Sequence, residues 1–406
     1  NYAVFTVDTT APSAPTSITS TDYPSDQWVK GAGQAGKFTV TPPTGDQNGI
    51  EWSLDGSTWT KVPTSGTTPV TFSVAPAKAG TNTLQVRATD KAENKSEAVS
   101  YTFHVGPGAV TSPDDGTRTA ARVPLAAEAD GSKYDHVTFS WRRGDADTWA
   151  PIPAADVTNG GQALASWPLA LTGGKSPKLT WNATSTVNPD GAVQVRADFT
   201  GPNSAATSSD PIGVVVDRSA DGAATQSVGP GSVNLLTGDY TLSGTDASFF
   251  GMSVSRTASS RTPQAGAGQE GQAPIFGKEW LSGTTAEALD SDYTQIVKTS
   301  ATSLNVSTAD GDTITFTANA AKTGWVPEPG SEDLTLTGSF TSGDFTLSDT
   351  DGTVTTFSKV NASATTWTVT SSLADGLANS TTKVVSEAVT VGGKTLARPK
   401  RIIAAT

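Results

Sequence analysis

The sequence predicts an all-β protein, with two tandem immunoglobulin-like β-sandwiches followed by an antiparallel β domain. Short runs of alternating apolar residues recur, as in residues 84–88 and 193–197, and a period of two is typical of half-buried strands. Turn-forming pairs such as Asp55-Gly56 separate these runs and supply the positive φ of tight hairpins. Apolar residues at helical spacing nowhere extend over ten or more positions. The two short candidates, residues 284–289 and 371–379, are therefore expected to be loops or single turns.

Strand ends followed by proline or small residues divide the chain into domains. At roughly 150 residues per domain, 406 residues suffice for about three. Both chain ends are interpreted as cut from a longer polypeptide, because the sequence begins at Asn1 without a Met and ends in a strand pattern. The expected units are residues 1–10 (the last strand of an upstream domain and a linker), 11–106 (first sandwich), 107–218 (second sandwich with an insertion), 219–225 (linker) and 226–406 (third domain).

The two sandwich units share a tryptophan-bearing hairpin and a later Val-Arg-Ala strand. Trp52 marks the hairpin of the first unit and Trp141 that of the second. A tryptophan on this strand is a hallmark of the sandwich core, so both are expected to pack there. Aligning the hairpin glycines puts Trp52 opposite Ser140. This alignment predicts that the inward face slips by one position and that the second hairpin loop is two residues longer.

This hairpin, together with the linker over residues 7–12, resembles the bacterial immunoglobulin-like repeats of large surface and secreted proteins. The resemblance covers about residues 1–218 and implies a spacer or adhesion unit rather than an enzyme. An insertion that includes Trp167 and Trp181 is expected to enlarge the second unit.

Composition excludes several functions. The chain has no cysteine, which rules out disulfides, Cys-type zinc sites and thiol nucleophiles. Its 27 basic residues are scattered against 39 acidic ones, giving a net charge of −12, so neither nucleic acid nor an anionic membrane surface is an expected partner. No apolar run approaches the roughly 18 residues that a membrane-spanning helix needs. Membrane insertion is therefore not expected.

The third domain carries a series of motifs in a fixed order. A Thr-Gly turn is followed by a strand ending in Ser-Arg-Thr, a Phe-Gly-x-x-Trp corner and an Asp-Gly-x-x-x-x-Phe hairpin. This series resembles the start of the shell of bacterial RHS/YD-repeat proteins. Two departures are the absence of any Tyr-Asp repeat and Ala258 in place of the family's strand aromatic. The residues that carry the resemblance are Gly238, Arg256, Phe276, Gly277, Trp280, Asp351, Gly352 and Phe357.

The resemblance implies a non-catalytic structural segment that packages or presents a C-terminal, toxin-like effector. Its partners would be the downstream RHS shell and effector of the same polypeptide, and its location secreted or cell-surface. The sheet after Gln226 is expected to continue beyond the last residue, and short linkers are expected to hold the modules in a stiff row. We assign no catalytic residue, no cofactor and no metal.

The alternative is an array of cell-wall or carbohydrate-binding modules attached to an exported enzyme. Trp325, beside Pro327 and Pro329 in an expected loop, is the candidate for stacking on a sugar ring. The sandwich tryptophans are interpreted instead as core and sheet-face packing. A glycan partner would distinguish this alternative from the structural segment.

Other residues that could carry chemistry have simpler explanations. The Asp-Gly clusters at residues 310–312 and 349–352 lack the spacing of a calcium loop and are expected to be hairpin turns. His104 and His136 lie in different units without a nucleophile motif, and paired carboxylates fall in turns. Residues 398–401 resemble a dibasic processing site, but their strand context favours an exposed β edge.

Overall fold

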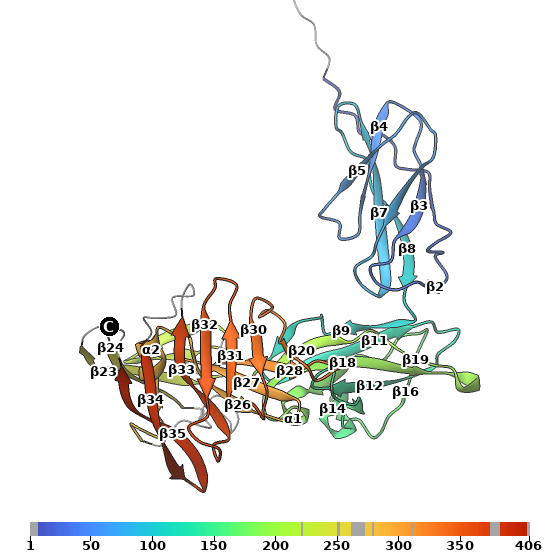
Figure 1. Ribbon diagram of the computed structural model, residues 1–406. Coiled ribbons are helices and arrows are strands. Elements are labelled where there is room, and N and C mark those ends of the chain that lie inside the picture. The colour runs from blue at the N-terminus through green and yellow to red at the C-terminus, as the bar shows by residue number, and fades with distance from the viewer. Residues whose placement is uncertain are drawn as a thin grey trace, which may run out of the picture.

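The computed structural model describes residues 7–220, 222–249, 252–260, 273–277, 280–309, 312–373 and 382–403, and these are almost entirely strands and turns (Figure 1). This confirms the all-β class. The two α-helices in this part of the chain are short: α1 (Ala183–Thr186) and α2 (Thr284–Leu289). The described residues contain no helix that is long and apolar enough to cross a membrane. Val7 is not in a strand, and residues 1–6 lie outside the described range.

The first domain is a sandwich of two sheets. A three-stranded sheet in the order β1-β3-β6 faces a five-stranded sheet in the order β2-β8-β7-β4-β5, with β2 parallel to β8. Alternate residues of both sheets turn inward, so that Phe38, Ile50 and Phe103 are fully buried between them. The strands are β1 (Ser17–Thr19), β2 (Trp28–Val29), β3 (Gly36–Thr41), β4 (Gln47–Ser53), β5 (Thr60–Pro63), β6 (Val70–Val74), β7 (Gly80–Asp90) and β8 (Val99–Val105).

The second domain repeats this plan with more strands. Its sheets run β15-β14-β17-β11-β9 and β10-β20-β18-β12-β13, and the parallel pair β10-β20 repeats the pair β2-β8. Two 3₁₀ turns cover Ala154–Asp156 and Pro202–Ser204. The strands are β9 (Gly108–Ser112), β10 (Thr117–Thr119), β11 (Arg122–Ala129), β12 (His136–Arg142), β13 (Ala150–Pro151), β14 (Val157–Asn159), β15 (Gln162–Ala163), β16 (Leu169–Ala170), β17 (Leu179–Asn182), β18 (Gly191–Thr200), β19 (Ala206–Ser208) and β20 (Ile212–Val216).

Strand register corrects the sequence alignment of the two sandwiches. Trp52 pairs with Val86 and Trp141 with Val195, so the two tryptophans are equivalent and Trp52 does not correspond to Ser140. Trp52 also pairs with Thr60, eight residues on, whereas Trp141 pairs with Ala150, nine residues on. The second hairpin loop is thus one residue longer, not two. Register follows the buried cross-strand pairs, and the loop absorbs the extra residue.

The two tryptophans assigned to the insertion of the second unit have different positions. Trp181 is fully buried on β17, which pairs with β11 as β6 pairs with β3, so it belongs to the core sheet. Trp167 lies between β15 and β16, where its Nε1–H donates to the Ile152 carbonyl at 2.7 Å. Only Trp167 is therefore in an added segment.

The described residues of the third domain form three sheets. A five-stranded sheet runs from β21 to β25 in chain order, and β34 pairs with β35 in a separate hairpin. The eight-stranded sheet has the order β29-β28-β27-β26-β33-β32-β31-β30, and its end strands β29 and β30 lie against each other. The strands are β21 (Thr225–Val228), β22 (Gly231–Asn234), β23 (Tyr240–Phe249), β24 (Met252–Ser259), β25 (Leu281–Ser282), β26 (Tyr293–Lys298), β27 (Ser303–Thr308), β28 (Thr313–Ala318), β29 (Trp325–Pro327), β30 (Thr335–Gly338), β31 (Asp344–Ser348), β32 (Val354–Ser358), β33 (Thr366–Leu373), β34 (Lys383–Val391) and β35 (Lys394–Ile403).

The eight-stranded sheet curls around an aromatic core. Phe316, Phe345, Phe357 and Trp367 are buried inside it, and Phe345 meets Trp367 edge to face at 5.0 Å. The expectation of an open sheet that continues past the last residue does not hold for this sheet, because its two end strands meet and a packed core fills it. Burial of large aromatic side chains is strong enough to favour closure over a flat, exposed border.

The modules are not arranged in a straight row. In Figure 1 the first sandwich stands away from the other two domains, which lie side by side, so the molecule is bent at the first junction. Two junctions therefore determine the shape of the molecule, one on each side of the second sandwich.

Candidate functional site at the domain junctions

The predicted sandwich landmarks pack against the two cores. Trp52 is half-buried on β4 and stacks on Phe72 with ring centroids 5.6 Å apart. Trp141 is half-buried on β12 and packs against the core of the second sandwich. Both tryptophans are thus engaged in packing within their own domain.

Trp325, the predicted sugar-stacking residue, lies on strand β29 rather than in a loop. Its Nε1–H donates to the Gly338 carbonyl on β30 at 2.9 Å. Its ring is half-buried and meets Phe340 edge to face at 5.2 Å. The side chain therefore joins the two end strands of the curled sheet. The flanking prolines suggested a loop, but proline is tolerated on an end strand.

The Thr-Gly turn of the third domain is held by one asparagine. Gly238, with a φ of +72°, donates its N–H to the Asn234 carbonyl at 2.8 Å. The Asn234 side chain accepts the N–H groups of Leu236 and Thr237 and donates to the Ala220 carbonyl at 2.9 Å. The turn is therefore tied to the chain that leaves the second sandwich.

The Phe-Gly-x-x-Trp corner packs against an arginine. The guanidinium of Arg256 lies 4.5 Å from the ring centroid of Trp280 and 5.9 Å from that of Phe276. Gly277 has a φ of +110°, which favours glycine at the corner. Lys278 and Glu279 lie outside the described residues. The three aromatic and cationic residues of the motif thus form one stack.

The Asp-Gly cluster at residues 349–352 forms a hairpin turn between β31 and β32. Asp351 accepts the Thr353 N–H at 2.7 Å, and this hydrogen bond lowers the pKa of the Asp351 carboxyl. Gly352 has a φ of +92°, and Phe357, further along β32, is fully buried. The corresponding turn at Asp310 and Gly311 lies outside the described residues.

The histidines lack the geometry of a catalytic base. His104 Nδ1 lies 3.1 Å from the Thr81 hydroxyl, but that hydroxyl donates its proton to Glu128 at 3.0 Å, so His104 must donate to it. His136 contacts Asp135 at 2.7 Å, and both side chains are largely exposed. Neither arrangement couples an accepting imidazole to a hydroxyl proton.

Glu128 joins the first two domains. This residue of the second sandwich is 7% exposed, and its Oε1 accepts the backbone N–H of Thr81 on β7 at 2.5 Å. A side chain at Gly80 would place its Cβ 2.9 Å from the same oxygen. The glycine therefore allows the two domains to approach closely, and the carboxylate satisfies the backbone donor there.

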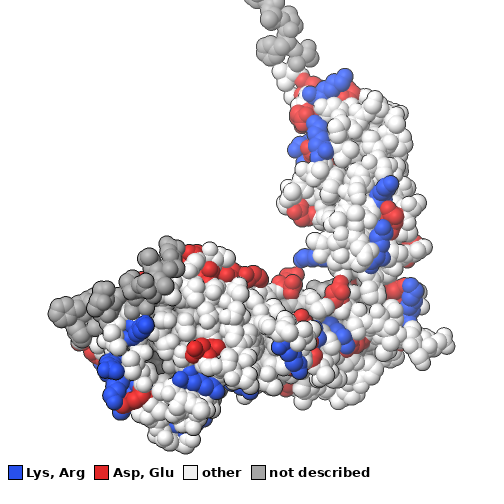
Figure 2. All heavy atoms as spheres, viewed as in Figure 1, with Lys and Arg blue, Asp and Glu red and all other residues white. Residues whose placement is uncertain are grey.

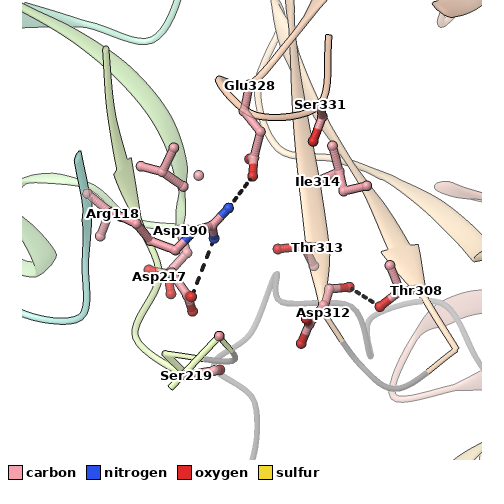
Figure 3. Close-up of a pocket in the computed structure, with 14 residues that line it drawn as sticks. Arg118, Asp190, Asp217, Ser219, Thr308, Asp312, Thr313, Ile314, Glu328 and Ser331 are labelled. Carbon is pink, nitrogen blue, oxygen red and sulfur yellow. Dashed lines mark hydrogen bonds and ion pairs between the residues drawn. The ribbon is translucent and has the colours of Figure 1, made fainter. Parts of the chain in front are cut away.

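An ion-pair network joins the second sandwich to the third domain (Figure 3). Arg118 on β10 donates from Nη2 to Glu328 Oε1 at 2.7 Å and from Nη1 to Asp217 Oδ2 at 3.4 Å. Glu328 is 3% exposed, and its other oxygen accepts the Thr315 N–H at 2.8 Å. Burial raises the pKa of Glu328, although the Thr315 N–H and Arg118 oppose the rise. Burial by itself would lower the pKa of Arg118. The carboxylates of Glu328 and Asp217 outweigh this effect and raise the pKa above its usual value.

Two glycines bring the backbones of these domains together. A Cβ at Gly144 would lie 2.5 Å from the Thr317 Cβ, and one at Gly191 would lie 2.5 Å from the Thr315 hydroxyl oxygen. Beside them, the Thr302 hydroxyl donates to Asp147 at 2.6 Å. Sequence reasoning missed this junction. No motif around Arg118 or Glu328 indicates it.

A hollow of about 310 Å³ adjoins this network and includes residues of both domains. Its carboxylates already have partners: Asp190 accepts from Arg218, and Asp217 accepts from Arg118 and from the Ala220 N–H. The group serves as a charged connection between domains.

Three other carboxylates in the described residues could hold a cation. Ligand atoms of Asp8, Asp46 and Asp90 lie within 4.8 Å of one another at the free end of the first sandwich. Asp90 also accepts the N–H of Asn94, so this group has a structural role in its loop.

The strand order defines the class of protein: tandem immunoglobulin-like, or fibronectin type III-like, sandwiches followed by a third β domain. No protein-family model matches the chain, and no curated protein resembles it in sequence.

Solved structures show partial similarity. The fibronectin(III)-like modules of Clostridium thermocellum CbhA are 14% identical, over 50% of this chain and 94% of theirs, with a TM-score of 0.19. A two-domain fibronectin type III segment of chicken tenascin is 10% identical, over 50% of this chain and 99% of that segment, with a TM-score of 0.17. The D00-D0 domain of Intimin is 16% identical, over 49% of this chain and 99% of that domain, with a TM-score of 0.19. The sandwich assignment rests on the strand order.

Proposed function

We propose that this chain is a non-catalytic structural segment of an exported or cell-surface protein. In this role the two sandwiches hold the third domain at a set position, from which it is presented to a partner. The domains act as one unit because each junction contains directional, charge-assisted hydrogen bonds.

The observation that carries the proposal is the bond between Arg118 and Glu328. The Glu328 carboxylate is 3% exposed, and the guanidinium of Arg118, from the other domain, donates a hydrogen bond to it at 2.7 Å. Buried ion pairs add little net stability, since desolvation offsets attraction, but their geometry restricts how two surfaces can meet. Such a pair is well suited to a junction whose purpose is orientation.

The test is a distance measurement between domains. The chain has no cysteine, so spin labels can be attached to Lys133→Cys in the second sandwich and Ser363→Cys in the third domain, both exposed. Double electron–electron resonance should give one narrow distance distribution, and Arg118→Met should broaden it. A broad distribution in the unmodified junction would refute a structural, orienting role. Labels at Lys133→Cys and Ser57→Cys test the first junction in the same way.

The identity of the partner rests on the motif resemblance. The proposal extends to an RHS-type polypeptide, in which a downstream shell and a toxin-like effector follow. The Gly238 turn, the stack of Arg256 on Trp280 and the Asp351-Gly352 hairpin support it as intact local structures. The coding sequence beyond residue 406 tests it: Tyr-Asp repeats there would support the shell, and an unrelated domain would overturn it.

A carbohydrate-binding array remains the second candidate. Trp325 supports it less than the sequence suggested, because the indole N–H and the ring edge already have partners. Pull-down with cell-wall polysaccharide distinguishes the two. Binding that Trp325→Phe abolishes without loss of folding would favour this candidate over the structural segment.

A further inference from the structure

Two neighbouring hollows form one groove in the corner between the three domains. The first, of about 340 Å³, lies between the first two sandwiches, and the second, of about 240 Å³, lies between the second sandwich and the third domain. They share Asp115, Pro211 and Ile212 as a common wall. The groove therefore runs along the edge of the second sandwich and ends on the domains at either side.

The walls of the groove are mostly small and apolar, although Lys78 also lines the first hollow and Arg143 the second. Alanine side chains of the first sandwich line one end, and Val326, Pro327 and Pro329 line the other. Val326 is 44% exposed, so an apolar side chain faces solvent there. Prolines lose little freedom when a ligand binds, so such a groove is organised before binding.

The two junctions hold this groove in shape. Glu128 bonded to Thr81 positions the first end, and Arg118 bonded to Glu328 positions the second. In the shared wall, the Gly213 N–H donates to Asp115 Oδ1 at 2.6 Å. The groove thus depends on contacts that join all three domains.

Negative charge lies at the shared wall. Asp115 of the shared wall is exposed, and so is Asp210, which lines the first hollow; no ion pair to Asp210 is found among the described residues. Asp114 is nearby, and Lys78 lies 3.8 Å from it, with both side chains exposed. Figure 2 shows acidic side chains on the faces that border this corner, together with basic ones on the first sandwich. A basic group between the two apolar hollows would complement this charge.

We propose that the groove binds an extended peptide segment in which a Lys or Arg lies between two apolar residues. The apolar side chains occupy the two hollows, and the basic group lies against Asp115 and Asp210. The hollows lack an aromatic platform, which disfavours a sugar, and the acidic wall disfavours nucleic acid and anionic lipid. An extended peptide in an apolar groove is a common mode of recognition between proteins.

Labelled peptides test the proposal by fluorescence polarisation with the full chain. The probes place Leu on both sides of a central Arg, with one to three Ser as spacers, and matched probes carry Glu in place of Arg. The best Arg probe should bind with a dissociation constant on the order of 10 µM, at least about tenfold tighter than its Glu partner. Raising the salt concentration should weaken it, because the acidic wall is exposed.

Variants locate the binding. Asp115→Asn keeps an acceptor for the Gly213 N–H but removes the charge, and combined with Asp210→Asn it should weaken the Arg probe about tenfold. Ala77→Arg, at an exposed position in the first hollow, should abolish binding by filling the groove. The matched control Asp333→Asn removes an exposed charge of the third domain and should change nothing.

Three results would overturn the proposal. They are equal binding of the Arg and Glu probes, no binding by any probe at millimolar concentration, and binding that Ala77→Arg leaves intact. Sedimentation of the chain alone provides a further check. Self-association that Ala77→Arg removes would assign the groove to a second copy of the chain instead of a separate peptide.

Discussion

Replacing Arg118 by methionine removes the cation from the junction while keeping most of the side-chain volume. Glu328 then stays buried but loses the hydrogen bond from Arg118 at 2.7 Å. Its carboxylate keeps the hydrogen bond from the Thr315 N–H at 2.8 Å. Removing one partner of a buried pair costs about 3–5 kcal/mol. Arg118 is 46% exposed, and protonation of Glu328 limits the loss. We therefore expect the free energy of unfolding to fall by about 2 kcal/mol.

The reverse change should cost less. Glu328→Gln leaves Arg118 half exposed and still beside Asp217 at 3.4 Å, so the guanidinium keeps water and a carboxylate. The amide oxygen can still accept the Thr315 N–H, whereas the NH2 group cannot accept from Arg118. Because a neutral side chain avoids burying charge, the net loss should still be about 1 kcal/mol. The double variant should resemble Glu328→Gln, since the methionine then faces no buried charge.

The cost of Arg118→Met also depends on pH. Burial raises the pKa of Glu328 above its usual 4.5, so the folded chain binds this proton more tightly than the unfolded chain. Protonated Glu328 therefore stabilises the folded chain fully when the pH is below the pKa that Glu328 has in the unfolded chain. This contribution is lost as the pH rises through the higher pKa that Glu328 has in the folded chain. As pH falls from 7 through that folded pKa, Glu328 becomes neutral and the penalty of Arg118→Met should shrink.

Urea unfolding of the full chain, followed by tryptophan fluorescence, measures these differences. Lys178→Met on the second sandwich is the matched control, because Lys178 is exposed and the substitution likewise replaces a basic side chain by methionine. A cost for Arg118→Met no greater than that of Lys178→Met would refute the reasoning. A greater cost for Glu328→Gln than for Arg118→Met would refute the asymmetry.

Three further predictions concern single contacts. Trp325→Ala should lower the free energy of unfolding by about 3 kcal/mol, through lost aromatic burial and the hydrogen bond to Gly338, as measured by urea titration against the milder Trp325→Phe. Gly144→Ala should cost about 1–3 kcal/mol and broaden the label distances across the second junction, whereas Gly222→Ala, which meets nothing within 4 Å, should do neither. Burial and nearby carboxylates raise the pKa of Tyr293 from 10.0 to about 12, so stability should fall between these pH values and fall less in Tyr293→Phe, as followed by circular dichroism.

Local features of this chain could be predicted from the sequence. The alternation of apolar residues predicted the strands of the sandwiches, because every second side chain of a half-buried strand faces the core. The Asp351-Gly352 turn and the tryptophan-bearing hairpins were predicted in the same way, since a tight turn needs a residue that accepts positive φ. These features depend on residues that are near one another along the chain.

Features that depend on distant residues required the tertiary structure. Trp325 is a bridge between end strands because Gly338 and Phe340 lie beside it, and no local pattern indicates that neighbour. Arg118 and Glu328 are 210 residues apart, and neither has a motif around it that predicts the other. The sequence determined which segments are strands and which residues are apolar. The tertiary structure decided how the sheet closes and how the domains meet, because closure and docking depend on which distant side chains share a buried space.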